Sequence, residues 1–387
     1  MSVRRRDHLG STGGARTGGG AESARPWGGA GAAHACARAV MTMLVAITAL
    51  LALGQPSIAQ GLYGMAAEAD GFTLPDPAYR FEFPGDHGPH PDFRIEWWYV
   101  TANLEAPDGT PYGIQWTLFR TALAPEETDD WESPQIWFGH AGLTTPESHF
   151  VAERFARGGI GQAGVTAQPF DAWIDEWAMR GPTISDVTLT AQGEDFAYEL
   201  FLDTDKPFVP QGDQGYSVKS EAGQASHYYS QPFYEVTGTL TLPSGEIPVT
   251  GNAWLDREWS SQPLTETQTG WDWFSLTFDT GEKLMGYRLR DEAAPLYAVS
   301  TWIAQDGTPT PYPPGAFSAD PLTETQVAGR EVPTRWQVTL PDRGVDVTVE
   351  AINPQSWMDT AFPYWEGPVT VTGSHEGIGY LEMTGYD

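Results

Sequence analysis

Frequent alternation between short β-type segments and turns is the feature that most limits what this chain can fold into. From Phe72 onward, Gly, Pro, Asp and Asn separate segments rich in β-branched and aromatic residues, and turn signals such as Pro243-Ser-Gly245 join many of them. The predicted strands are residues 96–103, 113–123, 187–191, 197–203, 234–242, 247–259, 271–278, 283–290, 298–303, 335–340, 345–352, 369–372 and 380–384. Helical periodicity is scarce, and only the stretch 147–157 is predicted as a short helix or a loop. About thirteen strands with frequent turns predict an all-β chain of sandwiches or barrels, and the number suits two of them.

The order of the segments indicates two domains. No sequence repeat of fixed period is visible, which argues against a propeller or a solenoid. A change of domain is expected between residues 235 and 265, without a flexible linker, so the two halves should pack together. We therefore predict a leader over residues 1–60, an N-terminal domain over 72–250 and a C-terminal domain over 251–387.

The first sixty residues are expected to be a disordered segment and a signal peptide. Residues 1–40 are rich in Gly, Ala and Arg without a periodic apolar pattern. The apolar run 41–54 precedes Ser57 and Ala59, which occupy the small-residue positions of a cleavage site. The run is too short to span a bilayer comfortably, and the alternative is a buried helix. We expect a periplasmic or secreted protein with no membrane-spanning segment after cleavage.

Charge and cysteine content exclude several function classes. The chain has a net charge of −30 at pH 7, and removal of the leader, with its six Arg and two acidic residues, leaves −34. Such a surface repels nucleic acid and anionic membranes, so no nucleic-acid partner is expected. Cys36 is the only cysteine and lies in the leader. A processed chain would therefore have no disulfide, no cysteine–metal site and no cysteine nucleophile.

The candidate functional residues are carboxylates that alternate with aromatic residues on predicted strands. Side chains two positions apart share one face of a strand. The groups that this alternation places on one face are Trp254 with Asp256 and Glu258, Glu96 with Trp98, and Trp271 with Trp273. If such a carboxylate faces an aromatic interior, desolvation raises its pKa and keeps it protonated near neutral pH. It could then donate a proton to an apolar guest, and the π-faces could stabilise a cation.

The alternative interpretation is structural. The same carboxylates could pair with Arg94, Arg257, and Arg288 or Arg290, while the indole rings fill hydrophobic cores. The alternation alone does not separate this interpretation from the catalytic one.

No metal or cofactor is predicted. Asp86, His87, His90 and Asp92 could be interpreted as metal ligands, but their spacing matches no zinc signature, and the Gly and Pro between them suit a surface turn. The sequence has no nucleophile elbow, P-loop or dinucleotide fingerprint.

Several blocks resemble a known family. Residues 83–104, with the run Glu96-Trp-Trp-Tyr99, resemble the first signature of the hydroxyneurosporene synthase (CrtC) family, which includes carotenoid 1,2-hydratases, AttH-like proteins and exported proteins labelled predicted secreted hydrolases. The run Trp254-Leu-Asp-Arg-Glu-Trp259, with 270–275, resembles the second signature, and the tail also fits. The resemblance covers residues 72–387 and implies two lipocalin-like antiparallel β-barrel domains packed together.

The resemblance also implies a reaction. The hydratases of this family add water to a terminal isoprenoid double bond of an acyclic carotenoid without a cofactor, and an aspartic acid protonates the alkene to form a carbocation that water captures. That aspartate looks like Asp256, with Trp254 where the hydratases have Tyr. Their His-x-aromatic pair looks like His227 and Tyr229, with Tyr in place of Trp.

Three hypotheses follow. In the first, a hydratase uses Asp256 as its acid and His227 to orient it or to position water. The residues expected to line its apolar substrate are Trp254, Tyr229, Trp271, Trp273, Glu258, Glu96 and Trp98. The second is a periplasmic carrier of lipid or another hydrophobic ligand, with a transporter as a partner. The third is a secreted hydrolase in which Asp256 and Glu258, or Glu96, activate water, although no nucleophile motif supports it. A cyclisation catalysed by shape alone is a further alternative.

Overall fold

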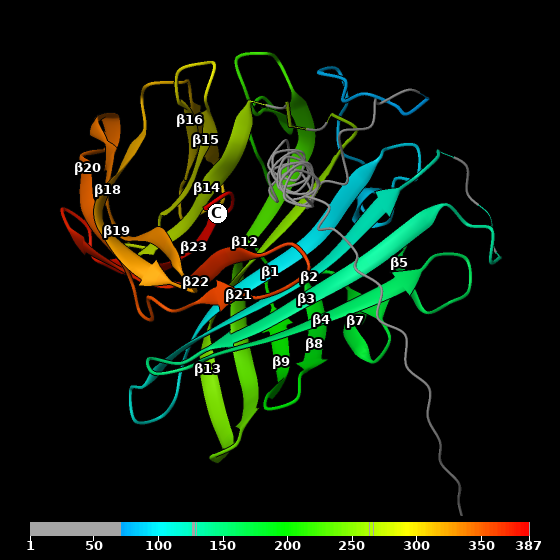
Figure 1. The fold of residues 1–387 in the computed structure, drawn as a ribbon, viewed down its shortest axis with the longest axis horizontal. Helices are drawn as coiled ribbons and strands as arrows, with labels where there is room; N and C mark the ends of the chain where they lie inside the picture. Colours follow the sequence, from blue (N-terminus) through cyan, green and yellow to red (C-terminus); the bar gives the residue numbers. More distant parts are fainter. Residues whose placement is uncertain (1–70, 126–127, 129, 263, 266, 387) are drawn as a thin grey trace, which may run out of the picture. The chain divides into compact units, whose positions relative to one another are not determined.

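The computed structural model describes residues 71–125, 128, 130–262, 264–265 and 267–386, which all belong to one compact unit. The predicted leader, its signal-peptide pattern and Cys36 lie outside the described residues. Within these residues, the regular structure consists of β-strands in two antiparallel sheets and two single-turn 3₁₀ helices, η1 (Gly85–His87) and η2 (Pro341–Arg343). Both sheets curl (Figure 1), which confirms the prediction of an all-β chain with two lipocalin-like antiparallel β-barrel domains.

The first sheet has thirteen strands in the order β4-β3-β2-β1-β13-β12-β9-β8-β7-β6-β5, with β10 and β11 also paired to β12. Its strands are β1 (Ile95–Glu105), β2 (Pro111–Ala122), β3 (Gln135–Thr144), β4 (His149–Arg157), β5 (Ala163–Ala167), β6 (Phe170–Ile174), β7 (Trp177–Thr183), β8 (Asp186–Gln192), β9 (Ala197–Asp203), β10 (Val209–Pro210), β11 (Tyr216–Val218), β12 (Ala225–Leu242) and β13 (Gly245–Ser260).

The second sheet has ten strands in the order β17-β16-β15-β14-β23-β22-β20-β19-β18, with β21 also paired to β22. Its strands are β14 (Gln268–Phe278), β15 (Lys283–Asp291), β16 (Tyr297–Ile303), β17 (Pro309–Tyr312), β18 (Ser318–Val327), β19 (Arg330–Leu340), β20 (Val345–Ala351), β21 (Trp357–Met358), β22 (Tyr364–Gly373) and β23 (Gly377–Met383).

Each sheet encloses its own hydrophobic core. In β8, Val187, Leu189 and Ala191 are buried and alternate with more exposed residues, as a strand with one covered face requires. Val345 and Val347 of β20 are likewise buried, in the second core, and alternate with more exposed residues. The alternation that predicted the strands therefore also fills the barrels.

β1 and the second half of β13 differ from these strands because they are buried on both faces. One face covers the first core, and the other faces the second sheet, where β22 and β23 lie beside β2 and β1 (Figure 1). The sheets approach closely at Gly113, where a Cβ atom would lie 2.5 Å from Cγ of Pro368. This close packing explains why these two strands have aromatic residues on both faces.

Two of the differences from the sequence-based expectations concern β4 and the domain division. The stretch 147–157, expected as a helix or a loop, contains strand β4, because His149–Arg157 extends the sheet by pairing with β3. The predicted division between residues 250 and 251 lies inside β13, and the change of sheet comes after Ser260.

Candidate active site

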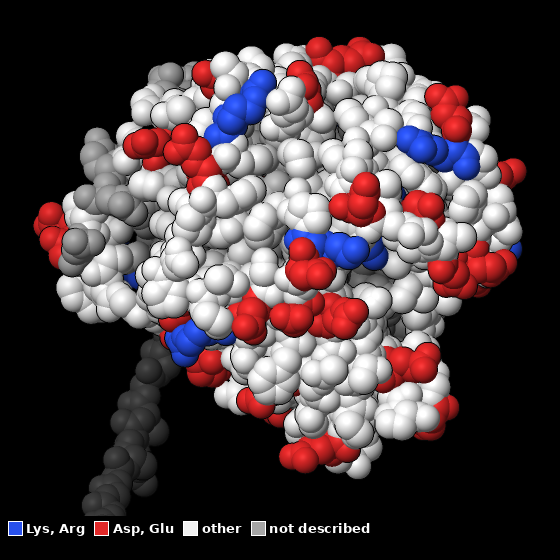
Figure 2. Space-filling model, turned by 180° about the vertical axis from the view of Figure 1, so that it is seen from behind, with Lys and Arg blue, Asp and Glu red and all other residues white. Residues whose placement is uncertain are grey.

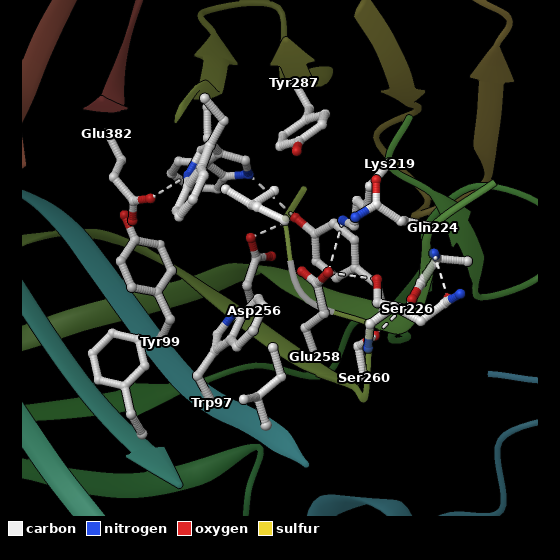
Figure 3. Close-up of a pocket in the computed structure, with 18 of the residues that line it drawn as sticks. Trp97, Tyr99, Lys219, Gln224, Ser226, Asp256, Glu258, Ser260, Tyr287 and Glu382 are labelled. Atoms are coloured by element: carbon white, nitrogen blue, oxygen red, sulfur yellow. Dashed lines mark hydrogen bonds and ion pairs between the residues drawn. The ribbon is translucent and has the colours of Figure 1, made fainter. Parts of the chain in front are cut away.

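A cavity of about 100 Å³ lies between the two sheets (Figure 3). A single buried water needs about 10–15 Å³ of such space, so the cavity is large enough for a ring or for one end of a longer molecule. Strands β1, β12 and β13 form one wall, and β14, β15, β22 and β23 form the other. The main aromatic lining residues are Trp97, Tyr99, Tyr228, Trp271, Trp273 and Tyr287. The walls are therefore largely π-surface.

Asp256 lies in this cavity on β13 and is only 3% exposed. Its Oδ2 accepts a hydrogen bond of 2.5 Å from the Tyr228 hydroxyl, and its Oδ1 accepts bonds from Ser230 Oγ at 2.5 Å and Trp254 Nε1 at 2.6 Å. Burial raises its pKa to about 7; the three hydrogen bonds oppose the shift, and the neighbouring Glu258 adds to it. Among the described residues no basic side chain forms an ion pair with Asp256, so its carboxyl can hold a proton near neutral pH.

A second carboxyl, Glu382 of β23, enters the cavity from the opposite wall (Figure 3). Its Oε1 accepts a hydrogen bond of 2.7 Å from Trp271 Nε1. Its pKa is raised to about 7, chiefly by burial; the Trp271 hydrogen bond opposes the shift, and the charges of Asp256 and Glu258 add to it. Two coupled carboxyls that titrate near neutrality can exist with one protonated and one ionised, which provides an acid and a base in the same cavity.

The third cavity carboxylate, Glu258, is ion-paired. Lys219 Nζ lies 2.8 Å from Glu258 Oε1, and Ser226 Oγ donates to the same oxygen at 2.5 Å. Lys219, Gln262 and Leu264 are half-buried and lie toward the rim, whereas Asp256 is buried deeper. The cavity therefore has a polar, ion-paired rim and an inner end of protonatable carboxyls.

Glu96 and Trp98, which were expected to line the substrate, lie on the opposite face of β1. Glu96 is fully buried between the guanidinium groups of Arg120 and Arg257 and forms ion pairs with both. Burial alone would raise its pKa, but the two cations outweigh burial and hold the pKa well below its usual range. The Arg257 guanidinium lies 3.8 Å from the Trp98 ring centre. The structural interpretation is therefore correct for Glu96.

The structure also separates His227 and Tyr229 from Asp256. Cross-strand partners share one face of a sheet, and Asp256 pairs with Ser230, whereas His227 pairs with Trp259 on the other face. His227 Nε2 accepts the backbone N–H of Asp76 at 3.3 Å. The Tyr229 hydroxyl lies 2.7 Å from Nδ1 of His87. Neither side chain lines the cavity, so the expectation that both act beside Asp256 is wrong.

A β-bulge determines which side chains of β12 face Asp256. Counting back from the turn between β12 and β13, Leu242 pairs with Gly245 and Tyr234 with Ala253, a register that would place Gln231 opposite Asp256. The pairing shifts by one residue between Gln231 and Tyr234, where β12 contains Pro232, which cannot donate to the ladder. A shift of one residue moves every following side chain to the other face. The even-numbered residues of β12, rather than His227 and Tyr229, therefore face Asp256.

Sequence reasoning missed Tyr228, Ser230 and Glu382. Tyr228 and Ser230 were adjacent to the residues chosen, and only the bulge determines which of the two sets faces the cavity. Glu382 is the one acid in the apolar stretch 380–383 of a predicted strand, and this isolated charge was the available signal. By contrast, Trp271 and Trp273 line the cavity, and Trp254 donates to Asp256 beside it.

The histidine-rich stretch is structural. Asp86 and His87 are buried in η1 rather than forming a surface turn. His90 Nε2 lies 3.3 Å from Asp86 Oδ1, and its ring stacks on Trp259 at 3.8 Å. In the part of the chain that the structure describes, no group of three or more His, Cys, Asp or Glu side chains is arranged to hold a metal ion.

The outer surface has a different chemistry from the cavity. Acidic side chains are spread over the face drawn in Figure 2, with basic ones between them. The charge expected from the sequence is thus present on this face, and it disfavours anionic ligands. Within the described ranges, no helix has the length and apolar character needed to cross a bilayer.

Comparisons with known proteins agree with this architecture. A family model described as AttH-like matches residues 74–386. The crystal structure of an AttH candidate from Nitrosomonas europaea is 34% identical, with a TM-score of 0.75, and the match covers 81% of this chain and 99% of that one. A comparison with curated protein sequences finds no match.

Two more distant structures share the fold. Kievitone hydratase from Nectria haematococca is 14% identical with a TM-score of 0.62, and the match covers 84% of this chain and 98% of that one. CghA, solved with Sch210972, is 13% identical with a TM-score of 0.52, and the match covers 82% and 97%. The match over residues 74–386 shows that the chain belongs to the AttH-like family.

Proposed function

We propose that the protein is a cofactor-independent hydratase that adds water to a carbon–carbon double bond of an apolar, isoprenoid-type substrate. The observation that supports this most strongly is Asp256, a buried carboxyl that lies among aromatic rings and has no basic partner in the part of the chain that the structure describes. A carboxylic acid that stays protonated near neutral pH is a competent general acid when its pKa lies near the working pH. In contrast to Glu96, Asp256 is not held in its charged form by a guanidinium group.

The proposed reaction uses the two coupled carboxyls in turn. The Asp256 O–H bond breaks as its proton forms a C–H bond with one alkene carbon, which leaves a carbocation at the other carbon. A water molecule forms the C–O bond, and its surplus proton passes to the Glu382 carboxylate. The sum is addition of one water, with one proton moved from Asp256 to Glu382, and solvent exchange restores both groups.

The aromatic lining suits a cationic intermediate with an apolar body. The faces of Trp and Tyr rings attract a cation, and in a site without competing water this attraction is worth about 2 kcal/mol. Trp271, Trp273 and Tyr228 lie around the two carboxyls. A tertiary isoprenoid cation disperses its charge over alkyl groups that such rings contact well, so an isoprenoid end is the substrate class that we favour.

The fold relatives give limited support. One of them is named as a hydratase, and this shared fold supports the proposal. The carrier hypothesis predicts binding without conversion, and the hydrolase hypothesis predicts cleavage of an ester. Both therefore remain as distinct outcomes of the test.

The test is incubation with lycopene and with geranylacetone in ¹⁸O-labelled water, followed by mass spectrometry of the extracted lipid. We expect a product that has gained one labelled water. Asp256→Asn should lower its formation by about 10²–10⁴-fold, which is the usual contribution of a general acid. His227→Gln, on the other face of the sheet, is the matched control and should retain activity.

Other outcomes separate the alternatives. Stoichiometric recovery of unaltered lipid from both the wild type and Asp256→Asn would indicate a carrier. Cleavage of p-nitrophenyl esters that depends on Asp256 would indicate a hydrolase. Undiminished hydration by Asp256→Asn would reject the proposed mechanism. Export of the protein, expected from the pattern of residues 41–59, is a separate proposal that N-terminal sequencing of the mature chain would test.

A further inference from the structure

Four aromatic side chains form one cross-strand row on the face of the first sheet that carries Asp256. Trp97 of β1 pairs with Phe119 of β2, Phe119 pairs with Phe138 of β3, and Phe138 pairs with Phe155 of β4. Cross-strand partners share one face of a sheet, so the four rings follow one another across the strands. The row begins at the cavity and ends on β4, the last strand of the sheet (Figure 1). Its length is about 14 Å, which is three strand spacings.

The row continues the wall of the cavity out to solvent. Trp97 and Phe119 line the cavity and are half-buried, so they belong both to its wall and to its mouth. The ring centres of Phe119 and Phe138 lie 4.5 Å apart in a stacked arrangement. Phe138 is buried beneath Phe155, at 6.2 Å, and the half-buried Phe362, at 5.7 Å. The outermost ring, Phe155, is 51% exposed. We call these five residues the aromatic band.

The aromatic band is long and narrow. The neighbouring row on the Asp256 side contains Thr117, His140 and Glu153, and the row on the other side contains Thr121, Ile136 and Arg157. Because side chains on one face recur every two residues, the band is about 7 Å wide. A protein interface needs a broader surface, about 800 Å² on each partner. A strip of about 14 by 7 Å instead has the shape of one extended hydrocarbon chain.

We propose that the aromatic band is a second part of the substrate site and binds the hydrocarbon chain of a long, linear substrate. The cavity, with about 100 Å³, holds only one end of such a molecule. A chain that leaves the cavity over Trp97 and Phe119 meets apolar rings as far as Phe155. This inference rests on the proposed function, because that function places the reacting end of the substrate beside Asp256. It adds that the substrate must extend several isoprene units beyond that end.

The test measures the affinity for three ketones, each one isoprene unit longer than the one before: geranylacetone, farnesylacetone and geranylgeranylacetone. The protein is the Asp256→Asn variant, so that binding is measured without turnover. Quenching of tryptophan fluorescence gives the dissociation constants. We expect the affinity to rise by about tenfold with each unit that lies on the aromatic band, because each unit removes apolar surface from water.

Two further substitutions in this background locate the chain. Phe155→Ser should lower the affinity for geranylgeranylacetone by about fivefold, because it removes apolar surface from the outer end of the band. The matched control is Phe201→Ser, because Phe201 of β9 is 52% exposed and has Thr188 and Thr237 as its cross-strand partners. This control should bind all three ketones as its parent does. If Phe155→Ser does not fold, Phe362→Ser removes a ring of the band from outside the first sheet.

Several results would overturn the proposal. Equal affinities for the three ketones would show that the chain does not extend beyond the cavity, and equal losses in Phe155→Ser and Phe201→Ser would show that it takes another path. If Phe155→Ser dissociates a dimer, or abolishes binding to phosphatidylcholine vesicles, while the ketone affinities stay unchanged, the band contacts a second copy or a membrane instead. All of these readouts are independent of turnover. An absence of hydration would therefore reject the proposed function and leave the chain-binding site in place.

Discussion

The two faces of the strand pair β1–β13 bury the same kind of group in opposite states. On one face, Glu96 lies between Arg120 and Arg257 and is held as a carboxylate. On the other face, Asp256 has only neutral hydrogen-bond donors and a pKa of about 7. Both side chains are nearly inaccessible to solvent, so burial alone does not distinguish them.

The difference lies in the neighbours. Two guanidinium groups compensate the desolvation of Glu96 and convert it into a structural ion pair. Tyr228, Ser230 and Trp254 orient Asp256 without neutralising it, which leaves the proton available for transfer. A carboxylate that alternates with tryptophans in a sequence can thus be either a structural ion pair or a proton donor. Whether a cation lies on the same face of the sheet determines which of the two it is.

The largest expected effect concerns stability at the structural face. Glu96→Gln leaves two buried guanidinium groups without their shared partner and should lower the free energy of unfolding by about 3–5 kcal/mol. Asp256→Asn removes no ion pair. At pH 8 the wild-type protein must keep a buried carboxylate at this position, so the neutral Asn should not lower the free energy of unfolding. Urea denaturation of both variants measures the contrast. Equal losses of unfolding free energy in the two variants would show that Glu96 and Asp256 have the same structural role.

The pH dependence of stability is the second test. The native pKa of Asp256 is raised from 3.8 to about 7, so between these values the folded state binds more protons than the unfolded state. Stability should therefore fall as pH rises from about 4 to about 7, by at most about 1.4 kcal/mol per pH unit for this group. Glu382 adds a loss of the same sign. Glu96 acts in the opposite direction, because its stabilisation is lost only as pH falls below about 4.5.

Asp256→Asn should therefore flatten the slope of stability between pH 5 and 7. The measurement is the urea midpoint at each pH, with Asp92→Asn, an exposed aspartate, as the control that leaves the slope unchanged. An unaltered slope in Asp256→Asn would mean that this group titrates at its usual value.

A neighbouring pair of tyrosines provides the smallest and most specific comparison. Tyr228 donates to Asp256, whereas Tyr229 bonds His87 on the opposite face. Tyr228→Phe removes a bond to the charged form, so it should raise the pKa of Asp256 by the equivalent of about 1.5–3 kcal/mol. Tyr229→Phe should leave that pKa unchanged. A reversed result would mean that the register through the bulge is wrong.

Much of the fold could be predicted from alternation and turns. Trp254, Asp256 and Glu258 share a face as the two-residue period requires, and Trp271 and Trp273 do so on β14. Local periodicity specifies which side chains are together on one strand. It does not specify which faces of different strands meet.

The site residues that sequence reasoning missed depend on how different strands pair. His227 was taken from the family resemblance, whereas one extra residue near Pro232 turns the even-numbered residues of β12 toward Asp256. Glu382 reaches Asp256 only because β23 pairs with β14 at the contact between the two sheets. Both are properties of long-range pairing. The aromatic character and acidity of the cavity were predictable, whereas the partners of Asp256 were not.

The most direct test of the account is the titration of Asp256 itself. Carboxyl-¹³C aspartate labelling, with the signal assigned by its loss in Asp256→Asn, reports the ionisation of this group by NMR. The account predicts a midpoint of about pH 7. A midpoint near pH 4, the usual range for an aspartate, would mean that Asp256 is ionised at neutral pH, and it would contradict the assignment of Asp256 as the acid.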